Sequence, residues 1–337
     1  MRPFLVPPGS APTPQRDAPT FSILIATYQA AETVVESVES ALAQTTPALE
    51  VIVVDDGSTD DTREQLAPYL ERIVYIRQEN RGAPAASNVG CARARGDFVS
   101  ILDADDAYDP RRLEALTELA RARPDLDILM TDAVLEVDGE PVGRVFDWTP
   151  FVVDEQLTAI FEKCFIAWPA VRRSAFEAVG GFDETLPIGY DWECWIRMLH
   201  RGARAGAVGE PLMRYRIGSR RSLTDDRVAA LRSRVRVLES AARLDLSEPE
   251  RRALEVQLGR RRRFALLADT EHALRARRPG ARRQSLEVAL SRGMPLGTRL
   301  RGLAAALAPG IAAGYLEALE TRTGHAYSRR RPPERRQ

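Results

Sequence analysis

Acidic residues follow two apolar runs of this sequence at the point where each run ends. Asp55 and Asp56 follow residues 51–54, and the acidic segment 103–106, with three aspartates, follows residues 98–102. Short apolar runs are typical of buried strands. Carboxylates crowded at the ends of neighbouring parallel strands repel one another unless a cation or a donor-rich ligand lies among them. The simplest ligand that meets this requirement is a nucleoside diphosphate carrying a divalent metal, so the pattern predicts an enzyme that uses nucleotide sugars.

The segment 103–106 could instead be a calcium loop or a solvated surface loop. An EF-hand calcium loop would need a ligand at Ala107 and a glycine at Tyr108, and it would follow a helix instead of a strand. A solvated acidic loop is the simpler alternative. The acidic pair 55–56 at an equivalent strand end favours the metal and diphosphate hypothesis.

Strands and helices are predicted to alternate from residue 21 onward. The predicted strands are 21–26, 50–54, 72–76, 97–102 and 127–130, and the predicted helices are 32–44, one from about 60, 84–94 and one from 110. Such alternation indicates βαβ units and a mostly parallel sheet covered by helices on both faces. Ligands bind such sheets at the carboxyl ends of the strands, where the strand order reverses. With the strand order 3-2-1-4, Tyr28, Asp56 and the segment 103–106 would converge on one site.

The rest of the chain is less regular. Predicted strands at 168–172 and 212–217 and a helix at 192–200 lie in an irregular stretch, and the chain is predicted to be helical after residue 225. Ser247 and Glu250 form a plausible capping box for one of these helices. Four regions follow: a disordered Pro-rich leader (1–19), an α/β domain (20–224), a helical extension (225–326) and a disordered basic tail (327–337).

Charge is distributed unevenly, although the formal net charge of the 337 residues is zero. Residues 225–337 hold 25 arginines and 13 acidic residues, a net charge of +12, which leaves −12 for residues 1–224. An acidic first part suits cation binding, and a basic second part suits an acidic partner or an anionic membrane surface. Three scattered cysteines indicate no disulfide framework, and no apolar stretch reaches the roughly 20 residues that span a bilayer. We therefore expect a cytoplasmic protein, with peripheral contact to the inner membrane face through its basic C-terminal region.

Several motifs taken together resemble the family 2 glycosyltransferases, which have the GT-A fold. The motifs are SILIATYQ (22–29), VVDDGSTD (53–60), ILDADD (101–106), GGFDE (180–184) and YDWECWIR (190–197). They occur in the family's order over residues 20–224 and do not extend into the helical part. The resemblance implies an α/β fold of the GT-A type, which is Rossmann-like with a mostly parallel sheet flanked by helices, here followed by an α-helical C-terminal extension.

The resemblance also implies roles for individual residues. Donor-binding residues would be Thr27, Tyr28, Asp55, Asp56, Arg81, Asn88, Asp103 and Asp105. Asp105 would bind Mg²⁺ or Mn²⁺ that bridges the diphosphate. Asp191 would be the general base; the simpler alternative is that it only caps its helix. Trp168, Tyr190 and Trp192 are candidates for the acceptor side, although aromatic residues in such a domain are more often part of the core.

The predicted function is inverting transfer of a sugar from a nucleotide-diphospho-sugar donor to a carbohydrate, lipid-linked or protein acceptor, in the synthesis of a cell-surface polysaccharide, glycolipid or glycoprotein. Ser87 and Tyr190 stand where the family usually has an arginine and an acidic residue, and no histidine lies near Gly218. These departures leave a noncatalytic nucleotide-sugar-binding module as one alternative. A sugar-phosphate nucleotidyltransferase is the other, although the Gly-rich basic loop expected after the first strand is absent. Nucleic-acid binding has no supporting motif.

Overall fold

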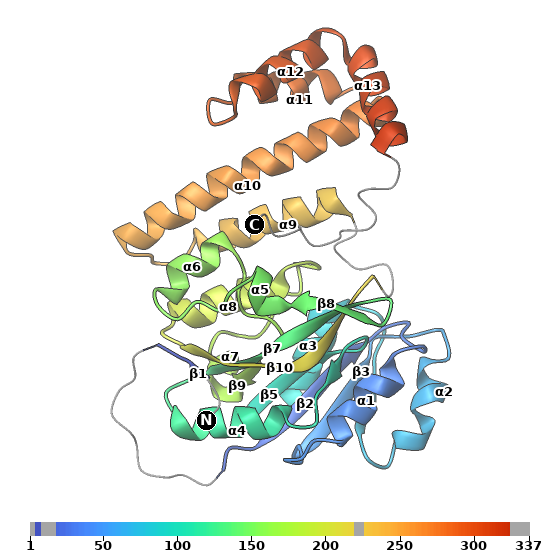
Figure 1. The fold of residues 1–337 in the computed structure, drawn as a ribbon, viewed down its shortest axis with the longest axis vertical. Coiled ribbons are helices and arrows are strands. Elements are labelled where there is room, and N and C mark those ends of the chain that lie inside the picture. The colour runs from blue at the N-terminus through green and yellow to red at the C-terminus, as the bar shows by residue number, and fades with distance from the viewer. Residues whose placement is uncertain (1–3, 8–17, 219–225, 324–337) are drawn as a thin grey trace. The chain divides into compact units, whose positions relative to one another are not determined.

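Figure 1 shows the computed structural model of the chain, which describes residues 4–7, 18–218 and 226–323. The described residues up to 218 form one compact unit together with residues 240–251, and residues 226–239 and 252–323 form a second. The predicted tail (327–337) and the predicted boundary between residues 224 and 225 lie outside the described residues.

The first unit is built on one large mixed sheet with the strand order β1-β10-β7-β9-β5-β2-β3-β4, and β6 and β8 are attached to β10 and β7. The strands are β1 (Phe4–Leu5), β2 (Phe21–Thr27), β3 (Glu50–Asp55), β4 (Val74–Arg77), β5 (Phe98–Asp103), β6 (Ala107–Tyr108), β7 (Ile128–Val137), β8 (Glu140–Arg144), β9 (Ala170–Arg172) and β10 (Ala205–Ile217). The segment β4-β3-β2-β5 is parallel throughout, which confirms the predicted order 3-2-1-4. β9 runs antiparallel between β5 and β7, so the sheet changes direction next to the acidic segment 103–106.

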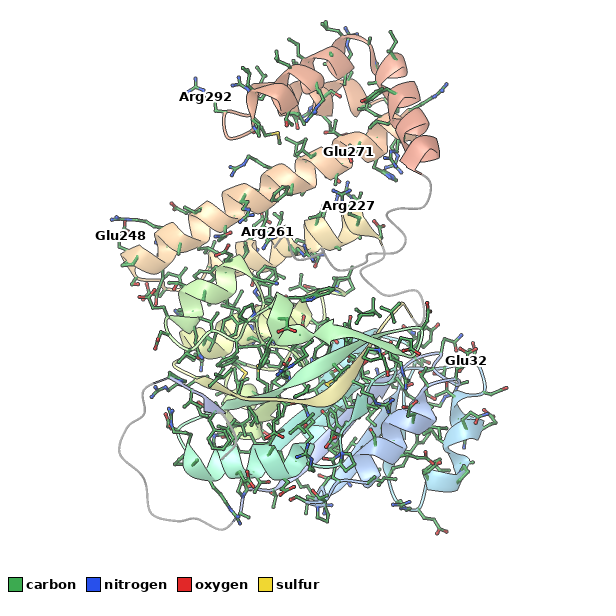
Figure 2. The ribbon with its side chains drawn as sticks, in the orientation of Figure 1. Glu32, Arg227, Glu248, Arg261, Glu271 and Arg292 are labelled. Atoms are coloured by element: carbon green, nitrogen blue, oxygen red, sulfur yellow. The ribbon has the colours of Figure 1, made fainter. Side chains whose placement is uncertain are left out.

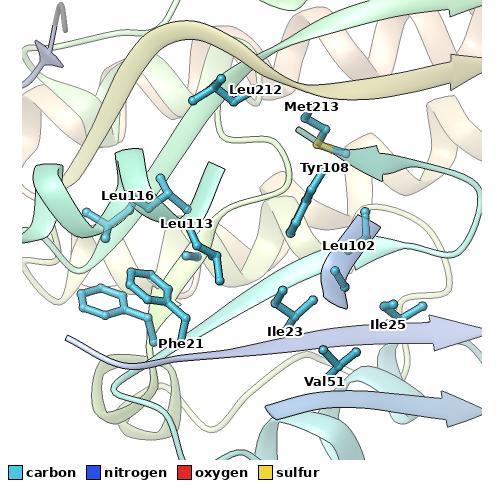
Figure 3. Packing of buried hydrophobic residues seen from close by; sticks show 14 of the residues in the cluster. Phe21, Ile23, Ile25, Val51, Leu102, Tyr108, Leu113, Leu116, Leu212 and Met213 are labelled. Carbon is cyan, nitrogen blue, oxygen red and sulfur yellow. The ribbon is translucent and has the colours of Figure 1, made fainter. Parts of the chain in front are cut away.

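Helices cover both faces of the parallel half of the sheet. Those of this unit are α1 (Val34–Leu42), α2 (Thr62–Leu66), the 3-10 helix η1 (Ala67–Tyr69), α3 (Ala83–Arg93), α4 (Arg112–Ala122), α5 (Val145–Trp148), α6 (Gln156–Glu162), α7 (Arg173–Ala178) and α8 (Tyr190–His200). Side chains alternate between the two faces of a strand. In β2, Ile23 and Ile25 therefore join the core beneath α1 and α4, where Figure 3 shows them close to Leu102 and Leu113.

The opposite face of β2 is covered by α3. A Cβ atom on Gly90 would lie 2.1 Å from Cδ1 of Leu24, so α3 approaches the sheet more closely than a residue with a side chain would allow. Because β2 lies between β3 and β5 in the sheet, this close contact helps to fix α3 against the strands that carry the acidic residues.

Three details bear on the predicted regions. Phe4 and Leu5 pair antiparallel with Val208 and Ala207 of β10, so the prediction of a disordered leader is wrong for these residues. Strand β7 continues past residue 130 and forms a hairpin with β8, which the sequence did not indicate. The capping box is supported, because the carboxylate of Glu250 accepts a hydrogen bond from the backbone N–H of Ser247 at 2.8 Å.

The second unit is helical. It comprises most of α9 (Arg227–Ala241) and α10 (Glu248–Arg275), together with α11 (Ala281–Leu290), α12 (Leu296–Leu307) and α13 (Pro309–Thr323). A small apolar cluster of Ala273, Leu274, Ala281 and Ala305 joins α10, α11 and α12. Gly302 makes the close contact between α11 and α12, since a Cβ atom there would lie 2.8 Å from Cγ1 of Val288.

Candidate active site at the carboxyl ends of the strands

Asp56 follows the end of β3 and organises the loop that leads into α3. Its buried carboxylate accepts hydrogen bonds from Gln78 Nε2 at 2.7 Å and from the backbone N–H groups of Arg81 (2.9 Å) and Gly82 (2.7 Å). A carboxylate has about four acceptor positions. One acceptor position of the Asp56 carboxylate is therefore left for a further hydrogen-bond donor, such as an N–H of a nucleotide base.

Asp55 has no exposed surface. Its carboxylate accepts the backbone N–H of Ser58 at 2.8 Å and the hydroxyl of Tyr75 at 2.6 Å, and the guanidinium of Arg77 lies 3.6 Å away. Burial and this hydrogen bond raise the pKa of the Tyr75 hydroxyl, so Tyr75 stays a neutral donor. The side chain of Asp55 therefore holds the turn after β3, and its donor-binding role stays a prediction.

The end of β2 presents two predicted donor-binding residues in different environments. Tyr28 is 52% exposed, which leaves its ring free to lie against a base or ribose. Thr27 is buried, and its hydroxyl has no hydrogen-bond partner among the described residues. An unpaired buried hydroxyl is uncommon in proteins, and it makes Thr27 a candidate for a hydrogen bond to a ligand.

Asn88 of α3 holds the loop that precedes α8. Its amide nitrogen donates to the carbonyl oxygen of Phe182 at 2.9 Å and to the carboxylate of Glu184 at 3.2 Å, while its oxygen accepts the N–H of Phe182 at 2.8 Å. Arg81 pairs with the same Glu184 at 2.7 Å, in an exposed ion pair. Both residues were predicted to bind the donor. In the structure the side chain of Asn88 is used to clamp the loop 181–184.

Three aspartates crowd the end of β5, as the sequence predicted. The pKa of Asp103 is raised to about 6, first by loss of water around the carboxyl and then by the charges of Asp105 and Asp191. Burial and the neighbouring carboxylates of Asp103 and Asp105 raise the pKa of Asp106 well above its ordinary value. One carboxylate oxygen of Asp106 accepts the N–H of Arg216 at 2.9 Å, and the other is buried without a partner among the described residues.

Trp168 is positioned directly at this cluster. Its indole N–H donates to Oδ2 of Asp103 at 2.8 Å, and its ring packs on Tyr215 with 4.5 Å between the centroids. The backbone of Trp168 has a φ of +45°, which is costly for a bulky residue and is found most often at functional sites. Its carbonyl oxygen accepts a hydrogen bond at 2.5 Å from the fully buried guanidinium of Arg112.

Arg216 of β10 is a cation in direct contact with the acidic segment. Its guanidinium donates to the backbone oxygen of Asp105 at 3.2 Å, forms an ion pair with Glu36 and lies 3.8 Å from Glu136. The sequence showed only that arginines, and no histidine, occur near Gly218. Arg220 and Arg221, two further cations of this region, lie outside the described residues.

Asp191 lies at the start of α8 and reaches the same cluster. Burial raises the pKa of its carboxyl, partly offset by hydrogen bonds from backbone N–H groups. Its charge in turn raises the pKa of Asp103, which places the two carboxyls near each other although they are 88 residues apart in the sequence. The predicted base therefore lies within electrostatic range of the predicted metal-binding segment.

The two positions that depart from the family's usual residues contact each other. The hydroxyl of Tyr190 is hydrogen-bonded to Ser87 of α3, and burial and the charges of Asp103 and Asp191 raise its pKa. The ring of Tyr190 packs edge-on against Phe182 at 5.1 Å. A tyrosine–serine pair thus stands at the two positions where the resemblance implies an arginine and an acidic residue.

The third aromatic candidate, Trp192, belongs to the core. It is 6% exposed, and its indole N–H donates to the carbonyl oxygen of Ile160 at 2.8 Å. Trp192 therefore packs in the core, and its acceptor-side role stays a prediction. Trp168 and Tyr190 lie at the acidic cluster. No sequence pattern pointed to Arg112 and Tyr215 as the contacts of Trp168, or to Glu36 as the ion-pair partner of Arg216.

Comparison with known proteins identifies the fold and the family. Residues 22–177 match the family model described as "Glycosyl transferase family 2". Succinoglycan biosynthesis protein ExoO of Rhizobium meliloti is 32% identical over 222 residues, which cover 58% of this chain and 60% of that protein. Chondroitin synthase of Escherichia coli is 30% identical over 55% of this chain and 27% of its own length. An uncharacterised glycosyltransferase of Rickettsia typhi is 28% identical, and the match covers 59% of its length, so the chain spans about three fifths of that relative.

Solved structures resemble the chain over most of its length. The first 349 residues of Staphylococcus aureus TarS in complex with UDP-GlcNAc superimpose with a TM-score of 0.60 at 18% identity and cover 90% of this chain and 92% of theirs. The mannosyltransferase PcManGT of Pyrobaculum calidifontis, solved with GDP-Man and Mn²⁺, gives 0.59 at 21% identity, with 95% and 90% covered. These likenesses confirm the predicted α/β fold of the GT-A type followed by C-terminal helices. By its match to the family model, the segment 22–177 is a glycosyl transferase family 2 domain.

Proposed function

We propose that this protein transfers a sugar from a nucleotide-diphospho-sugar to an acceptor hydroxyl, with inversion at the anomeric carbon. The observation that carries the proposal is the convergence of Asp191 with the carboxylates at the end of β5, where its charge affects the ionisation of Asp103. A base facing the donor-binding edge of the sheet is what a single displacement requires.

The donor would lie across the ends of β2, β3 and β5. Asp56 has one acceptor position left for the base, and exposed Tyr28 is placed to contact the base or ribose. Thr27 directly precedes Tyr28 at the end of β2, and its hydroxyl has no hydrogen-bond partner among the described residues. TarS was solved with UDP and with UDP-GlcNAc, and PcManGT with GDP-Man, which supports a nucleotide-diphospho-sugar as the donor class.

The acidic cluster suits a divalent cation. Burial, and after it the charges of neighbouring carboxylates, raise the pKa values of Asp103 and Asp106, and one oxygen of Asp106 is buried without a partner among the described residues. A positive charge here would relieve the repulsion between the carboxylates. Asp105 would hold Mg²⁺ or Mn²⁺, as hard cations often use one or two carboxylates and keep several waters. The cation would neutralise charge on the departing nucleoside diphosphate, a contribution of several kcal/mol.

The protein's own groups would then complete the reaction. Ionised Asp191 takes the proton of the acceptor hydroxyl. At the same time the hydroxyl oxygen of the acceptor bonds to the anomeric carbon, and the bond from that carbon to the diphosphate breaks. Trp168 orients the Asp103 carboxylate through the 2.8 Å hydrogen bond. Arg216 positions the acidic segment through its contacts with Asp105 and Asp106. The names of ExoO and chondroitin synthase support a role in polysaccharide synthesis.

The test is a comparison of Asp191→Asn with the wild type on donor binding and on turnover. We expect unchanged affinity for the nucleotide sugar, and release of nucleoside diphosphate in the presence of an acceptor array reduced by about 10²- to 10⁴-fold. Asp147→Asn, which changes an exposed aspartate of α5, is the matched control and should behave as the wild type.

Two results would contradict the proposal in different ways. Donor binding by the wild type without any nucleotide release, with every acceptor and in hydrolysis, would indicate a noncatalytic binding module. Full turnover by Asp191→Asn would show an enzyme in which another group is the base.

A further inference from the structure

Helix α12 exposes a continuous stripe of leucines. Leu296, Leu300, Leu303 and Leu307 are 68, 57, 43 and 70% exposed, and their spacing of four, three and four residues places them on one side of the helix. The buried positions of α12 are the small residues Gly302, Ala305 and Ala306. The helix therefore packs through its small residues and presents its large apolar residues to solvent.

This arrangement reverses the usual pattern of a surface helix, in which the apolar stripe faces the core. Single exposed leucines are normal. Here the neighbouring helices add four more large apolar residues, so that eight occur within residues 286–315. The four are Leu286 (45%) and Leu290 (67%) of α11, and Ile311 (78%) and Tyr315 (63%) of α13. Such a concentration indicates a surface that binds something.

The charge of residues 275–301 indicates which kind of partner this apolar surface binds. Residues 275–301 contain eight arginines and one acidic residue, Glu287, which is paired with Arg283. Arg282, Arg292 and Arg301 are exposed, and Figure 2 shows Arg292 between α11 and α12. A second copy of this face would bring like charges together, whereas an anionic bilayer surface offers the opposite charge and an apolar layer within reach.

The described helices do not include one that is both long and apolar enough to cross a bilayer. An amphipathic helix with leucines on one side and arginines around it lies in the interfacial plane instead. We propose that the leucine stripe of α12, with the arginines of residues 275–301, docks this protein on an anionic membrane surface. The inference stands apart from the proposed glycosyl transfer, since it uses none of the residues of that site.

The experiment measures binding of the full chain to vesicles. Co-sedimentation is compared for vesicles of phosphatidylcholine alone and vesicles with about a quarter phosphatidylglycerol, in low salt and in 0.5 M NaCl. The test variant is Leu300→Gln with Leu307→Gln. Glutamine preserves helix propensity, and both positions are already exposed, so circular dichroism should be unchanged. The control is Leu49→Gln with Leu70→Gln, which alters two exposed leucines of the other unit. A second test variant, Arg282→Gln with Arg292→Gln and Arg301→Gln, probes the charge.

We expect the wild type to bind the anionic vesicles, to bind neutral vesicles weakly and to dissociate in high salt. Each test variant should lose at least about tenfold in partitioning, from lost apolar burial or lost attraction to the lipid surface. The control should match the wild type. Three results would overturn the inference. The first is no binding of the wild type to anionic vesicles. The second is binding that survives in the leucine variant and so originates elsewhere, such as in the arginine-rich tail, and the third is a concentration-dependent dimer that the leucine variant abolishes in place of vesicle binding.

Discussion

Replacing Asn88 by alanine separates a structural role from a ligand-binding one. The Asn88 side chain makes two hydrogen bonds to the backbone of Phe182: its amide oxygen accepts the Phe182 N–H at 2.8 Å, and its amide nitrogen donates to the Phe182 carbonyl oxygen at 2.9 Å. A third hydrogen bond goes to Glu184. Phe182 is 4% exposed, so water has little access to replace the lost partners. Asn88→Ala should therefore leave two backbone groups of a buried residue unpaired.

The expected loss of stability follows from these contacts. Each buried polar group left unpaired costs about 1–3 kcal/mol, so the two backbone groups together give a loss of about 2–6 kcal/mol in the free energy of unfolding. For a domain of 150–250 residues, 1 kcal/mol shifts the melting temperature by about 2–4 °C. We expect a decrease of about 4–24 °C in the melting temperature of the first unit.

The assay is thermal and urea unfolding of the wild type, Asn88→Ala and Arg81→Ala. Arg81→Ala removes the exposed ion pair to the same Glu184, which should cost less than about 1 kcal/mol. Asn88→Asp keeps the acceptor for the Phe182 N–H, loses the donor and adds a charge beside Glu184, so it should also be destabilised. A melting temperature of Asn88→Ala within about 1 °C of the wild type, combined with weaker donor binding, would refute the clamp and restore the donor-binding role.

Three single features of the site and of the sheet give further predictions. Trp168→Phe removes the hydrogen bond to Asp103 and keeps a ring against its neighbour, so kcat/KM should fall about five- to tenfold at unchanged stability; unchanged kinetics would show that the indole N–H has no positioning role. Gly90→Ala should destabilise the protein by about 1–3 kcal/mol because the methyl group meets Leu24. In a double-mutant cycle of urea unfolding, Leu24→Ala in the same chain should recover part of that loss, and additive losses would contradict the close contact. Burial raises the pKa of Asp191, and because a base acts only when ionised, kcat/KM should fall as pH decreases, with a midpoint above that of an ordinary aspartate; a pH–rate profile that stays flat on the acid side would contradict its role as base.

Much of the first unit follows from local sequence. The alternation of short apolar runs and helical segments led to the parallel order β4-β3-β2-β5, and acidic residues at the ends of two of these strands led to the site. The strand order and the position of the site follow from the spacing of apolar residues and from the general geometry of βαβ units. A single sequence shows this spacing directly.

What the sequence did not reveal depends on contacts between distant segments. Asp55 and Asp56 are adjacent, chemically identical and both buried, yet their partners differ: Tyr75 of β4 donates to Asp55, and Gln78, which follows β4, donates to Asp56. Trp192 and Asp191 differ in role because α8 turns about 100° per residue and buries one of them. The pairing of Phe4 and Leu5 with β10 joins residues about 200 positions apart, which no local pattern encodes.

The outward leucines of α12 have a similar origin. Their spacing predicts an amphipathic helix, and the usual expectation is that such a stripe faces the core. Only the tight contact of Gly302 with Val288 of α11 shows that the small residues form the packed side.

Calorimetry of nucleotide-sugar binding tests the donor site most directly. UDP, GDP, CDP and dTDP sugars would each be titrated into the wild type and into Asp105→Asn, with Mn²⁺, Mg²⁺ or EDTA. We predict that one nucleotide class binds in the presence of the cation and that Asp105→Asn loses the cation-dependent part of this binding. Absence of binding by every nucleotide sugar, or binding that Asp105→Asn leaves unchanged, would contradict the assignment of the site at the end of β5.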